Sequence, residues 1–365
     1  MKVPFFGNDR QFKNLEDIIH ETSKRVWLTG QYLNGPDISH FEESLAKFTN
    51  RRFALTLGSC TDALTYALLA LKLPAGSEVL VTNFSFLSSA TAILKAGLKP
   101  IFCDIDPETM MVTSQIFQES ITPKTKAILS VSLFGSLTDC ENIESLCKER
   151  GISLIEDAAQ SFGAKRSGRM AASFGEASAI SFDPTKLLHG TGAGGALLTD
   201  NEELYLFAKS LRLHGRDERG NFIRLGDKSL LSSHDGAIMN EKLKLLPMWI
   251  KRRQDIAKRY TSALKESKIL KTQHIPNDVH STFHKFVILC NSQESRDALK
   301  NHLKEKDILT RIHYPKTISE EELFKEANGI TPIAYEQTKR VLTLPLFQEL
   351  TDEEVDYVCA ALAEF

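Results

Sequence analysis

The sequence lacks the cysteine spacing that is typical of zinc and iron–sulfur sites. Its six cysteines are scattered along the chain, and no two of them form a CxxC pair. They are Cys60, Cys103, Cys140, Cys147, Cys290 and Cys359. A metal site therefore has little support, and free thiols in a reducing cytosol are the simplest interpretation. Cys60 lies in a short loop of small residues, where it fits as a small side chain that fills a tight turn.

The chain also lacks a strong charge of one sign and a long apolar run. Lys and Arg number 45 against 47 Asp and Glu, which gives a formal net charge of −2. This balance does not favour a nucleic-acid partner. The longest apolar stretches have the length of strands, not of a membrane-spanning helix. The N-terminus has no basic segment followed by an apolar one, so we expect no signal peptide and a cytoplasmic protein.

Alternating apolar and amphipathic segments between about residues 50 and 200 predict the fold. Five short apolar runs are typical of buried strands, at residues 78–82, 99–105, 126–133, 152–158 and 177–182. Segments with helical character lie between strands, at residues 61–73, 85–97 and 140–151. This alternation predicts an α/β fold in which helices cover both faces of a mainly parallel sheet. Ligands of such sheets bind beyond the carboxyl ends of the strands.

The pattern changes after residue 200. A helical segment at residues 201–215 leads into a polar stretch, and a long helix is expected from about Ser232 to Lys268. Further on, strands are expected at residues 283–290 and 308–314 with a helix between them, and a last helix at residues 352–365. We therefore predict a large domain over residues 1–245 and a smaller C-terminal α+β domain over residues 246–365.

The segment SFDPTKLLHGTGAGGALLTD, residues 181–200, carries the strongest chemical signal. It places Lys186 after an apolar run and a turn, and glycines follow at positions 190, 192, 194 and 195. A lysine in such a turn, with small residues that let a flat ligand approach, suits an amine that forms a Schiff base. A surface lysine beside a glycine hairpin is the alternative, and it would be preferred if this segment stood alone.

The loop Gly58-Ser59-Cys60-Thr61 is a candidate phosphate site. Its small and hydroxyl residues would leave N–H groups free at the N-terminus of the next helix, which attracts anions. The sequence has no G-x-G-x-x-G motif and no Walker lysine, so the loop suits one phosphate better than a dinucleotide. Plain N-capping by Ser59 or Thr61 explains the same residues about equally well.

Three further residues stand near the ends of predicted strands. Asp157 ends a buried strand, where a carboxylate needs a cationic partner, and a protonated pyridine nitrogen would supply one. Its neighbour Glu156 alternates to the opposite face and is expected to be structural. Phe86 can stack on a ring and Ser181 can bond a phosphate oxygen, although a core aromatic and an ordinary serine are the alternatives. In order along the chain, the loop, these residues and Lys186 predict a site for pyridoxal 5′-phosphate (PLP).

At these motifs the chain resembles the sugar aminotransferases of the DegT/DnrJ/EryC1/StrS family, which are PLP enzymes of fold type I. The resemblance covers most of the chain and follows ordered blocks, at residues 27–71, 74–106, 154–164, 181–200 and 311–315. It implies a PLP-dependent transferase fold type I, with a mainly parallel seven-stranded sheet between helices and a smaller C-terminal α+β domain.

The resemblance implies a role for each matching residue. Lys186 would be the Schiff-base lysine and general acid–base, and Asp157 would pair with the pyridine nitrogen. Gln160 would lie near the phenolic oxygen of the ring, and Phe86 would stack on the ring. The phosphate cup would consist of Ser59, Cys60, Thr61 and Ser181. The substrate pocket is expected near His189, His313, Tyr314 and Lys316, for which a solvated loop is the alternative.

The family also implies the cofactor forms and the partners. PLP would alternate with its amine form, PMP. The substrates would be a nucleotide-linked keto-sugar, carrying dTDP, UDP or GDP, together with glutamate or glutamine as the amino donor. A homodimer with shared active sites is implied. No metal, membrane or nucleic-acid partner is expected.

The sequence departs from the family pattern in three places. Ala193 stands where the family usually has an acidic residue, and Leu230 corresponds to an Asn or Arg that reaches the phosphate of the partner subunit. Lys228, Ser229 and Ser232 are the candidates to replace that contact. Asp235-Gly236 also replaces the usual Gln-Ala. We therefore expect that the inter-subunit phosphate contact or the substrate pocket differs from that of a typical member.

Two other functions remain open from the sequence. The first is a PLP- or PMP-dependent sugar dehydratase of the same family, although members of that branch replace the lysine with histidine. The second is a regulatory protein on the same fold without catalytic activity, which the unusual block after residue 225 favours. The retained Lys186, Asp157 and Ser181 favour an aminotransferase.

Overall fold

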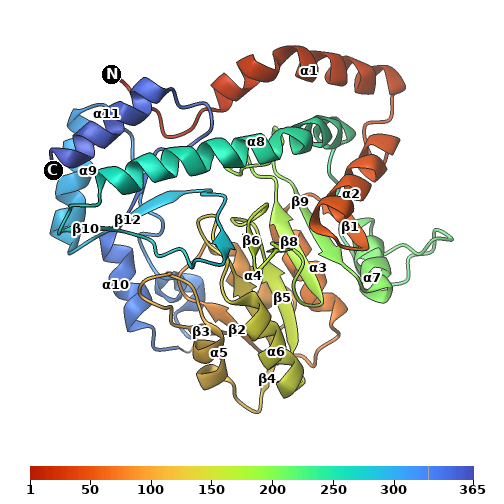
Figure 1. Ribbon diagram of the computed structural model, residues 1–365. Helices are drawn as coiled ribbons and strands as arrows, with labels where there is room; N and C mark the ends of the chain where they lie inside the picture. Colours follow the sequence, from red (N-terminus) through yellow and green to blue (C-terminus); the bar gives the residue numbers. More distant parts are fainter. Residues whose placement is uncertain (328) are drawn as a thin grey trace.

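The computed structural model describes residues 1–327 and 329–365, and a seven-stranded sheet forms its centre (Figure 1). The strand order is β1-β9-β8-β5-β4-β2-β3. The strands are β1 (Phe53–Leu57), β2 (Glu78–Thr82), β3 (Lys99–Cys103), β4 (Thr125–Val131), β5 (Ser153–Asp157), β8 (Ala177–Ser181) and β9 (Gly195–Thr199). Strands β8, β5, β4, β2 and β3 are parallel, and β9 runs antiparallel to both of its neighbours. The predicted α/β fold with a mainly parallel sheet is confirmed.

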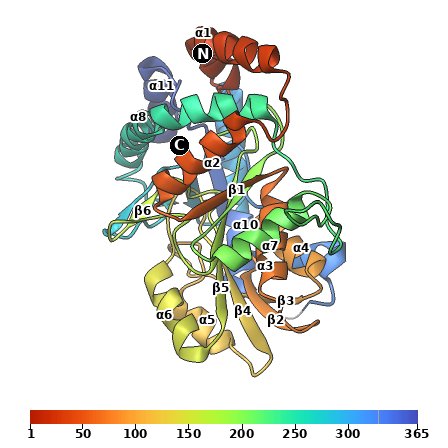
Figure 2. The same cartoon turned by 90° about the vertical axis from the view of Figure 1, so that its right-hand side faces the viewer.

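Helices cover both faces of this sheet. On one side α3 (Cys60–Ala70) packs against α4 (Ser88–Lys95) and α7 (Glu202–Arg212). On the other side α5 (Ser114–Ser120) packs against α6 (Cys140–Arg150). Figure 2 shows the two groups on opposite sides of β4 and β5. Because both faces are covered, every residue of β2 is buried, which explains why the strands read as continuous apolar runs.

A 31-residue helix, α8 (Ser233–Ala263), runs along one end of the molecule (Figure 1). It contacts α1 (Asn8–Thr29), α2 (Pro36–Thr49) and α11 (Asp352–Ala363). The predicted long helix is confirmed, although it ends five residues earlier than expected. The boundary predicted between residues 245 and 246 lies inside α8, and the division into two domains stays a prediction.

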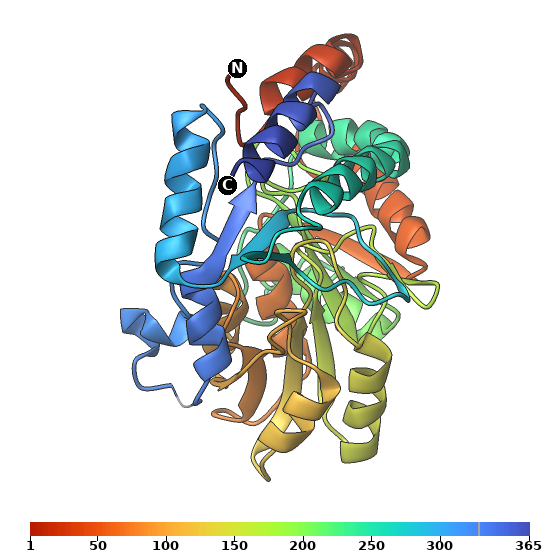
Figure 3. The same cartoon turned by 60° about the vertical axis from the view of Figure 1, so that its left-hand side comes forward.

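The C-terminal part contains a smaller sheet with helices beside it (Figure 3). Its strands are β10 (Leu270–Thr272), β12 (Phe286–Cys290) and β13 (Val341–Leu344), all antiparallel to their neighbours. Its helices are α9 (Gln293–Glu305), α10 (Pro332–Arg340) and the 3-10 turns η1 (Ile318–Glu320) and η2 (Glu322–Phe324). A third small sheet joins β6 (Lys165–Arg166), β7 (Arg169–Met170) and β11 (Val279–His280).

The prediction of a strand at residues 308–314 is wrong. The segment makes two isolated bridges, between Ile308 and Val3 and between Arg311 and Thr343. Because these bridges go to two different partners, the N-terminal segment and β13, neither pairing extends into a ladder. The first bridge also brings the start of the chain into the apolar core of the C-terminal part, where Val3 is fully buried.

A buried polar cluster stabilises the sheet on the face opposite the predicted site. Glu156 is 1% exposed and accepts hydrogen bonds from the N–H groups of Ala172 (2.9 Å) and Phe174 (3.0 Å) and from Ser178 Oγ (2.9 Å). Arg51 donates to Ser178 Oγ (3.0 Å) and forms an ion pair with Asp200 (2.8 Å). Burial raises the pKa of Glu156, and the two backbone donors and Arg51 oppose that rise. This surrounding agrees with the structural role predicted for Glu156.

Replacing this carboxylate should therefore destabilise the fold. In Glu156→Ala, two N–H groups and the Ser178 hydroxyl lose their acceptor, so the free energy of unfolding should fall by roughly 3 kcal/mol. Chemical denaturation followed by circular dichroism measures the change. Glu149→Ala, on the exposed side of α6, is the control and should shift stability by less than about 0.5 kcal/mol. Equal stability of the two variants would contradict the assignment.

Candidate active site

A cavity of about 480 Å³ lies at the carboxyl ends of the parallel strands. The end of β5, the end of β8, the first residues of α3 and the loop after β2 form its walls on the side of the large sheet. All eight residues predicted for the cofactor line it: Ser59, Cys60, Thr61, Phe86, Asp157, Gln160, Ser181 and Lys186. The structure thus brings together residues that are separated by as many as 127 positions (from 59 to 186) in the sequence.

Lys186 is held by the turn that precedes it. Asp183 accepts hydrogen bonds from the N–H (2.9 Å) and the hydroxyl (2.6 Å) of Thr185, and the N–H of Lys186 donates to the Asp183 carbonyl at 2.8 Å. Burial lowers the pKa of the Lys186 amine, and the charges of Cys60, Asp157 and Asp183 oppose the change in that order. A lowered pKa increases the neutral, nucleophilic fraction of the amine near neutral pH.

Asp157 presents a buried carboxylate to the same cavity. Its Oδ2 accepts from Ser89 Oγ at 2.7 Å, and its Oδ1 accepts from the N–H of Ala159 at 3.1 Å. Burial raises the pKa of Asp157, while the Ser89 and Ala159 hydrogen bonds and the charge of Lys186 lower it. A cationic group placed against this carboxylate would remove most of the cost of keeping it ionised.

The Gly58–Thr61 loop leads into the start of α3, which lies at the cavity wall. Ser59 Oγ caps the helix by accepting from the N–H of Asp62 at 3.0 Å. The N–H groups of the first turn have no acceptor inside the helix, and they lie at the cavity wall. Gly195 at the start of β9 passes very close: a Cβ there would lie 2.4 Å from the nitrogen of Cys60. Glycine is therefore required at position 195 for β9 to pass the start of α3.

The other predicted cofactor residues surround the cavity as follows. Phe86 is 61% exposed and lies at the cavity wall, so its ring is free to contact a ligand. Ser181 Oγ accepts from the N–H of Asp183 at 3.3 Å. Gln160 is fixed at both ends: its Oε1 accepts from the N–H of Phe134 at 3.3 Å, and its Nε2 donates to the hydroxyl of Tyr314 at 2.6 Å.

Only part of the predicted substrate set reaches the cavity. His313 and Tyr314 line it, whereas His189 and Lys316 do not. His189 is buried elsewhere, with Nδ1 2.9 Å from the Gly190 carbonyl, and Lys316 is exposed. Burial and then the charge of Lys285 lower the pKa of His313 to about 3, so that His313 is a neutral group near pH 7.

Sequence reasoning missed six cavity residues that carry polar side chains. These are Ser85, Ser88, Ser89, Asp183, Thr185 and Lys285. The pair Ser88-Ser89 follows Phe86 closely and begins α4, which was a usable signal. Asp183 belonged to the recognised turn. Lys285 gave no signal, because it lies in a different part of the chain and only the packing of β12 brings it to the cavity.

The block that departs from the family pattern has a defined structural role. Ser229 Oγ accepts from the N–H of Gly58 at 2.9 Å and donates to Asp62 at 2.7 Å, so it braces the loop before α3. Asp235 accepts from the N–H and the hydroxyl of Thr191, both at 2.8 Å, and ties the glycine segment to α8. Ala193 lines the cavity, and Leu230 is partly buried.

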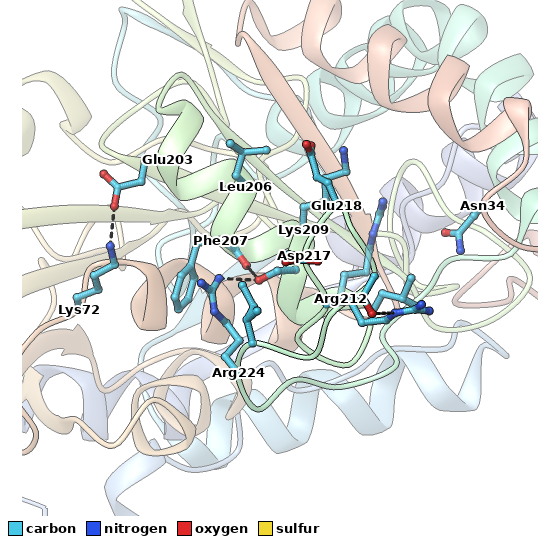
Figure 4. Close-up of a pocket in the computed structure, with 15 residues that line it drawn as sticks. Asn34, Lys72, Glu203, Leu206, Phe207, Lys209, Arg212, Asp217, Glu218 and Arg224 are labelled. Carbon is cyan, nitrogen blue, oxygen red and sulfur yellow. Dashed lines mark hydrogen bonds and ion pairs between the residues drawn. The ribbon is translucent and has the colours of Figure 1, made fainter.

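A larger cavity, of about 660 Å³, lies beside α7 and the loop that follows it (Figure 4). Its charged side chains are partly paired with other residues. Lys72 Nζ lies 2.6 Å from Glu203, and Arg224 donates to Ser210 Oγ at 2.7 Å. None of the residues predicted for catalysis or cofactor binding lines this cavity. Size alone is therefore a poor guide to the chemistry here.

A metal-binding cluster and a membrane-spanning helix are both absent from the described residues 1–327 and 329–365. Within them, no group of three or more His, Cys, Asp and Glu side chains is arranged to hold a metal ion. Among the helices of that same part of the chain, none has both the length and the apolar character needed to cross a membrane.

Replacing Asp157 and replacing Ser89, which donates a hydrogen bond to it, should have opposite effects on the stability of the protein. Because burial raises the pKa of Asp157, its ionised form costs stability at pH values above the folded-state pKa, and Asp157→Asn removes that cost. Without cofactor, we expect the melting temperature of Asp157→Asn at pH 7 to equal or exceed that of the wild type. Ser89→Ala removes a donor to the charged form and should lower it. A thermal melt of both proteins at pH 7 checks this, and a clearly destabilised Asp157→Asn would contradict it.

The comparisons with known proteins agree with this geometry. Residues 14–363 match the DegT/DnrJ/EryC1/StrS aminotransferase family. The UDP-2-acetamido-2-deoxy-3-oxo-D-glucuronate aminotransferase of Pseudomonas aeruginosa is 32% identical over 360 residues, covering 99% of this chain and 99% of the relative. The "Pleiotropic regulatory protein" of Geobacillus stearothermophilus is 33% identical over 368 residues, covering 100% and 99%.

Solved structures give the same result. The crystal structure of S. venezuelae DesV in complex with a ketimine intermediate has a TM-score of 0.96 and 28% identity, covering 100% of this chain and 98% of DesV. An aminotransferase of the same family from Brucella abortus has a TM-score of 0.95 and 29% identity, covering 100% and 99%. The chain therefore belongs to the DegT/DnrJ/EryC1/StrS family of PLP-dependent sugar aminotransferases, as its sequence motifs predicted.

Proposed function

We propose that this enzyme transfers an amino group from glutamate or glutamine to a keto-sugar linked to dTDP, UDP or GDP. PLP would bind in the cavity of Lys186, and PMP would be the form between the two half-reactions. The observation that carries the proposal is the meeting, in one cavity, of a buried lysine, a buried carboxylate and a helix N-terminus.

The residues of the cavity fit PLP. Asp157 is a buried carboxylate that accepts two hydrogen bonds. Within the described residues it forms no ion pair with a cationic side chain. A protonated ring nitrogen would balance its charge. The N–H groups at the start of α3, with Ser59, Thr61 and Ser181 nearby, would hold the phosphate. Phe86 would contact one face of the ring, and Gln160 would face its phenolic oxygen.

Each side chain of the site then has a task in the reaction. Bound PLP supplies an electron sink that stabilises negative charge on the substrate carbon that loses a proton. Lys186 Nζ would accept that proton and donate it again later in the reaction. The same amine must therefore act first as a base and then as an acid. Its lowered pKa supports this use. Asp157 would keep the ring nitrogen protonated, and Tyr314, held by Gln160, would help to exclude water.

The relatives support the substrate class. Besides the P. aeruginosa enzyme, they include the GDP-perosamine synthase of Escherichia coli O157:H7, 31% identical. The 3-oxo-glucose-6-phosphate:glutamate aminotransferase of Bacillus subtilis is also 31% identical, and its name supports glutamate as donor. Since that relative acts on a sugar phosphate, the alternative that differs least from our proposal is a keto-sugar acceptor that carries no nucleotide.

Two other functions are distinguished by experiment. The likeness to the G. stearothermophilus regulatory protein favours a regulatory role, for which PLP would bind without turnover on any keto-sugar. A sugar dehydratase would form a deoxy-sugar from a keto-sugar nucleotide and glutamate without transferring the amine. Lys186 at the cavity, with His189 outside it, favours the aminotransferase over this second alternative.

We also propose a homodimer, because large apolar side chains are exposed in two segments that lie near each other. Trp27 and Leu28 end α1, and Leu28 is 79% exposed. Phe222 and Leu225 are in the loop after α7, and Leu225 is 95% exposed. Figure 2 shows the α1–α2 connection and the loop after α7 toward one side of the molecule. A second copy covering this side would bury these groups.

The covalent role of Lys186 predicts a spectral result. Wild-type protein incubated with PLP should gain a visible absorbance band, and borohydride should fix the cofactor to Lys186, as peptide mapping would show. Lys186→Ala should lose the band, and its transamination rate should fall by about 10³-fold or more. Lys72→Ala, a change at an exposed lysine, is the control. A wild type without the band in excess PLP would rule out the proposed function.

The dimer predicts a change in mass. Wild-type protein should have about twice the 40.8 kDa of one chain by light scattering after size exclusion. Leu28→Glu combined with Leu225→Glu places two charges in the proposed interface, so the variant should be monomeric at micromolar concentration. Ile330→Glu, a change at a side chain that is 94% exposed and elsewhere, should leave the mass unchanged. A monomeric wild type would refute the dimer.

A further inference from the structure

Lys285 is a second buried lysine at the cavity of Lys186. It lies one residue before β12, is 8% exposed and lines the cavity together with His313 and Tyr314. It also borders a neighbouring cavity of about 640 Å³ between the small sheet and the loop after β3. In the described residues no carboxylate lies within ion-pair distance, 4.0 Å, of its ammonium group.

The backbone around Lys285 is fixed to the large sheet. The N–H of Lys285 donates to the Phe134 carbonyl at 3.2 Å, and the N–H of Thr282 donates to the Gly135 carbonyl at 2.9 Å. Gly135 has a φ of +98°, and a Cβ there would lie 2.4 Å from the nitrogen of His284. The loop after β4 and the segment before β12 therefore touch through backbone atoms. Since Phe134 also donates to Gln160, Lys285 has a defined position relative to the cofactor residues.

The charges around Lys285 are mostly positive. Burial, followed by the charges of Lys186, Arg253 and Arg311, lowers the pKa of Lys285 to about 7, whereas Asp183 alone acts in the opposite direction. His284 and His313 face the same region with lowered pKa values and are neutral near pH 7. Asp157 lies beside Lys186 and is the acid expected to pair with the cofactor ring. An unpaired buried ammonium group is costly, and an anion in the cavity would relieve that cost.

We propose that Lys285 binds a carboxylate of the substrate and thereby determines which substrates the cavity accepts. This inference rests on the function proposed above and narrows its substrate class. The carboxylate belongs either to the amino donor, such as the carboxylates of glutamate, or to an acceptor sugar of the uronic-acid type. Both sources offer a carboxylate to the buried ammonium group. The two would form a charge-assisted hydrogen bond, which is strong in a site of low dielectric constant.

The test uses the PLP-loaded enzyme and the variants Lys285→Gln, Lys285→Arg and Lys271→Gln. Each half-reaction is followed by the change in cofactor absorbance, so that an apparent Kd and a rate are obtained separately. The ligands are L-glutamate and two UDP-linked 3-amino sugars, one with a carboxylate at C6 and one with a hydroxymethyl group there. Lys271 borders the neighbouring cavity and not that of Lys186, so Lys271→Gln is the matched control.

In Lys285→Gln, the apparent Kd of the carboxylate ligand should rise by about tenfold or more, with little change in the maximal rate and an unchanged absorbance band. A loss confined to L-glutamate assigns the carboxylate to the donor, and a loss confined to the C6 carboxylate assigns it to the acceptor. Lys285→Arg keeps the charge and should recover most of the affinity. Unchanged affinity of Lys285→Gln for all three ligands would overturn the proposal. A wild type without the absorbance band would instead reject the proposed function.

A second measurement uses the pH dependence of the same binding step. Lys285 loses its proton above about pH 7, so the affinity of the wild type for the selected carboxylate ligand should fall with rising pH, by up to about tenfold per unit. Lys186, Asp183, His284, His313, Arg253 and Arg311 face the same region and are present in both proteins. Their contributions therefore cancel in the comparison with Lys285→Gln, which should lack this slope. Identical slopes in the two proteins would also overturn the proposal.

Discussion

The fold and the cavity both depend on two successive carboxylates at the end of β5, which have different surroundings. Glu156 and Asp157 point to opposite faces because side chains alternate along a strand. Glu156 is surrounded by backbone donors and by Arg51, and it joins the segment after β7 to the sheet. Asp157 accepts two hydrogen bonds. Among the described residues it has no ion-pair partner, so its charge is available for a ligand. The stability of the centre and the chemistry of the cavity therefore depend on the same strand and on its register.

Much of the large sheet was predictable because its local signals were consistent. The parallel strands are buried on both faces and read as apolar runs, and the chemical residues of the site follow the ends of those strands. Ordered motifs near Lys186, Asp157 and Ser59 then predicted the family, whose members depend on PLP. The residues predicted for the cofactor reach the cavity because one element, or two consecutive elements, defines the position of each side chain.

The C-terminal part was less predictable, for physical reasons. Residues 308–314 have the composition of a strand, but their partners are Val3 and Thr343, which only the complete fold brings near. His189 follows Lys186 closely in sequence, yet it is buried away from the cavity. Lys285 reaches the cavity through the packing of β12 against the loop after β4. Long-range backbone contacts of this kind leave no local pattern in the sequence.

The path of the chain has a consequence for motion within the protein. The first residues pack in the core of the C-terminal part, with Val3 in the apolar cluster that also contains residues of β12 and α11 and with Arg10 paired to Glu354 at 2.6 Å. Two helices, α1 and α8, therefore cross covalently between the two regions, in place of a single linker. Hydrogen bonds join the same regions at the cavity, from the N–H of Lys285 to the Phe134 carbonyl (3.2 Å) and from Gln160 to Tyr314 (2.6 Å). Any movement of the Tyr314 and Lys285 wall away from the large sheet would therefore have to break these bonds, while α1 and α8 keep the two regions tethered.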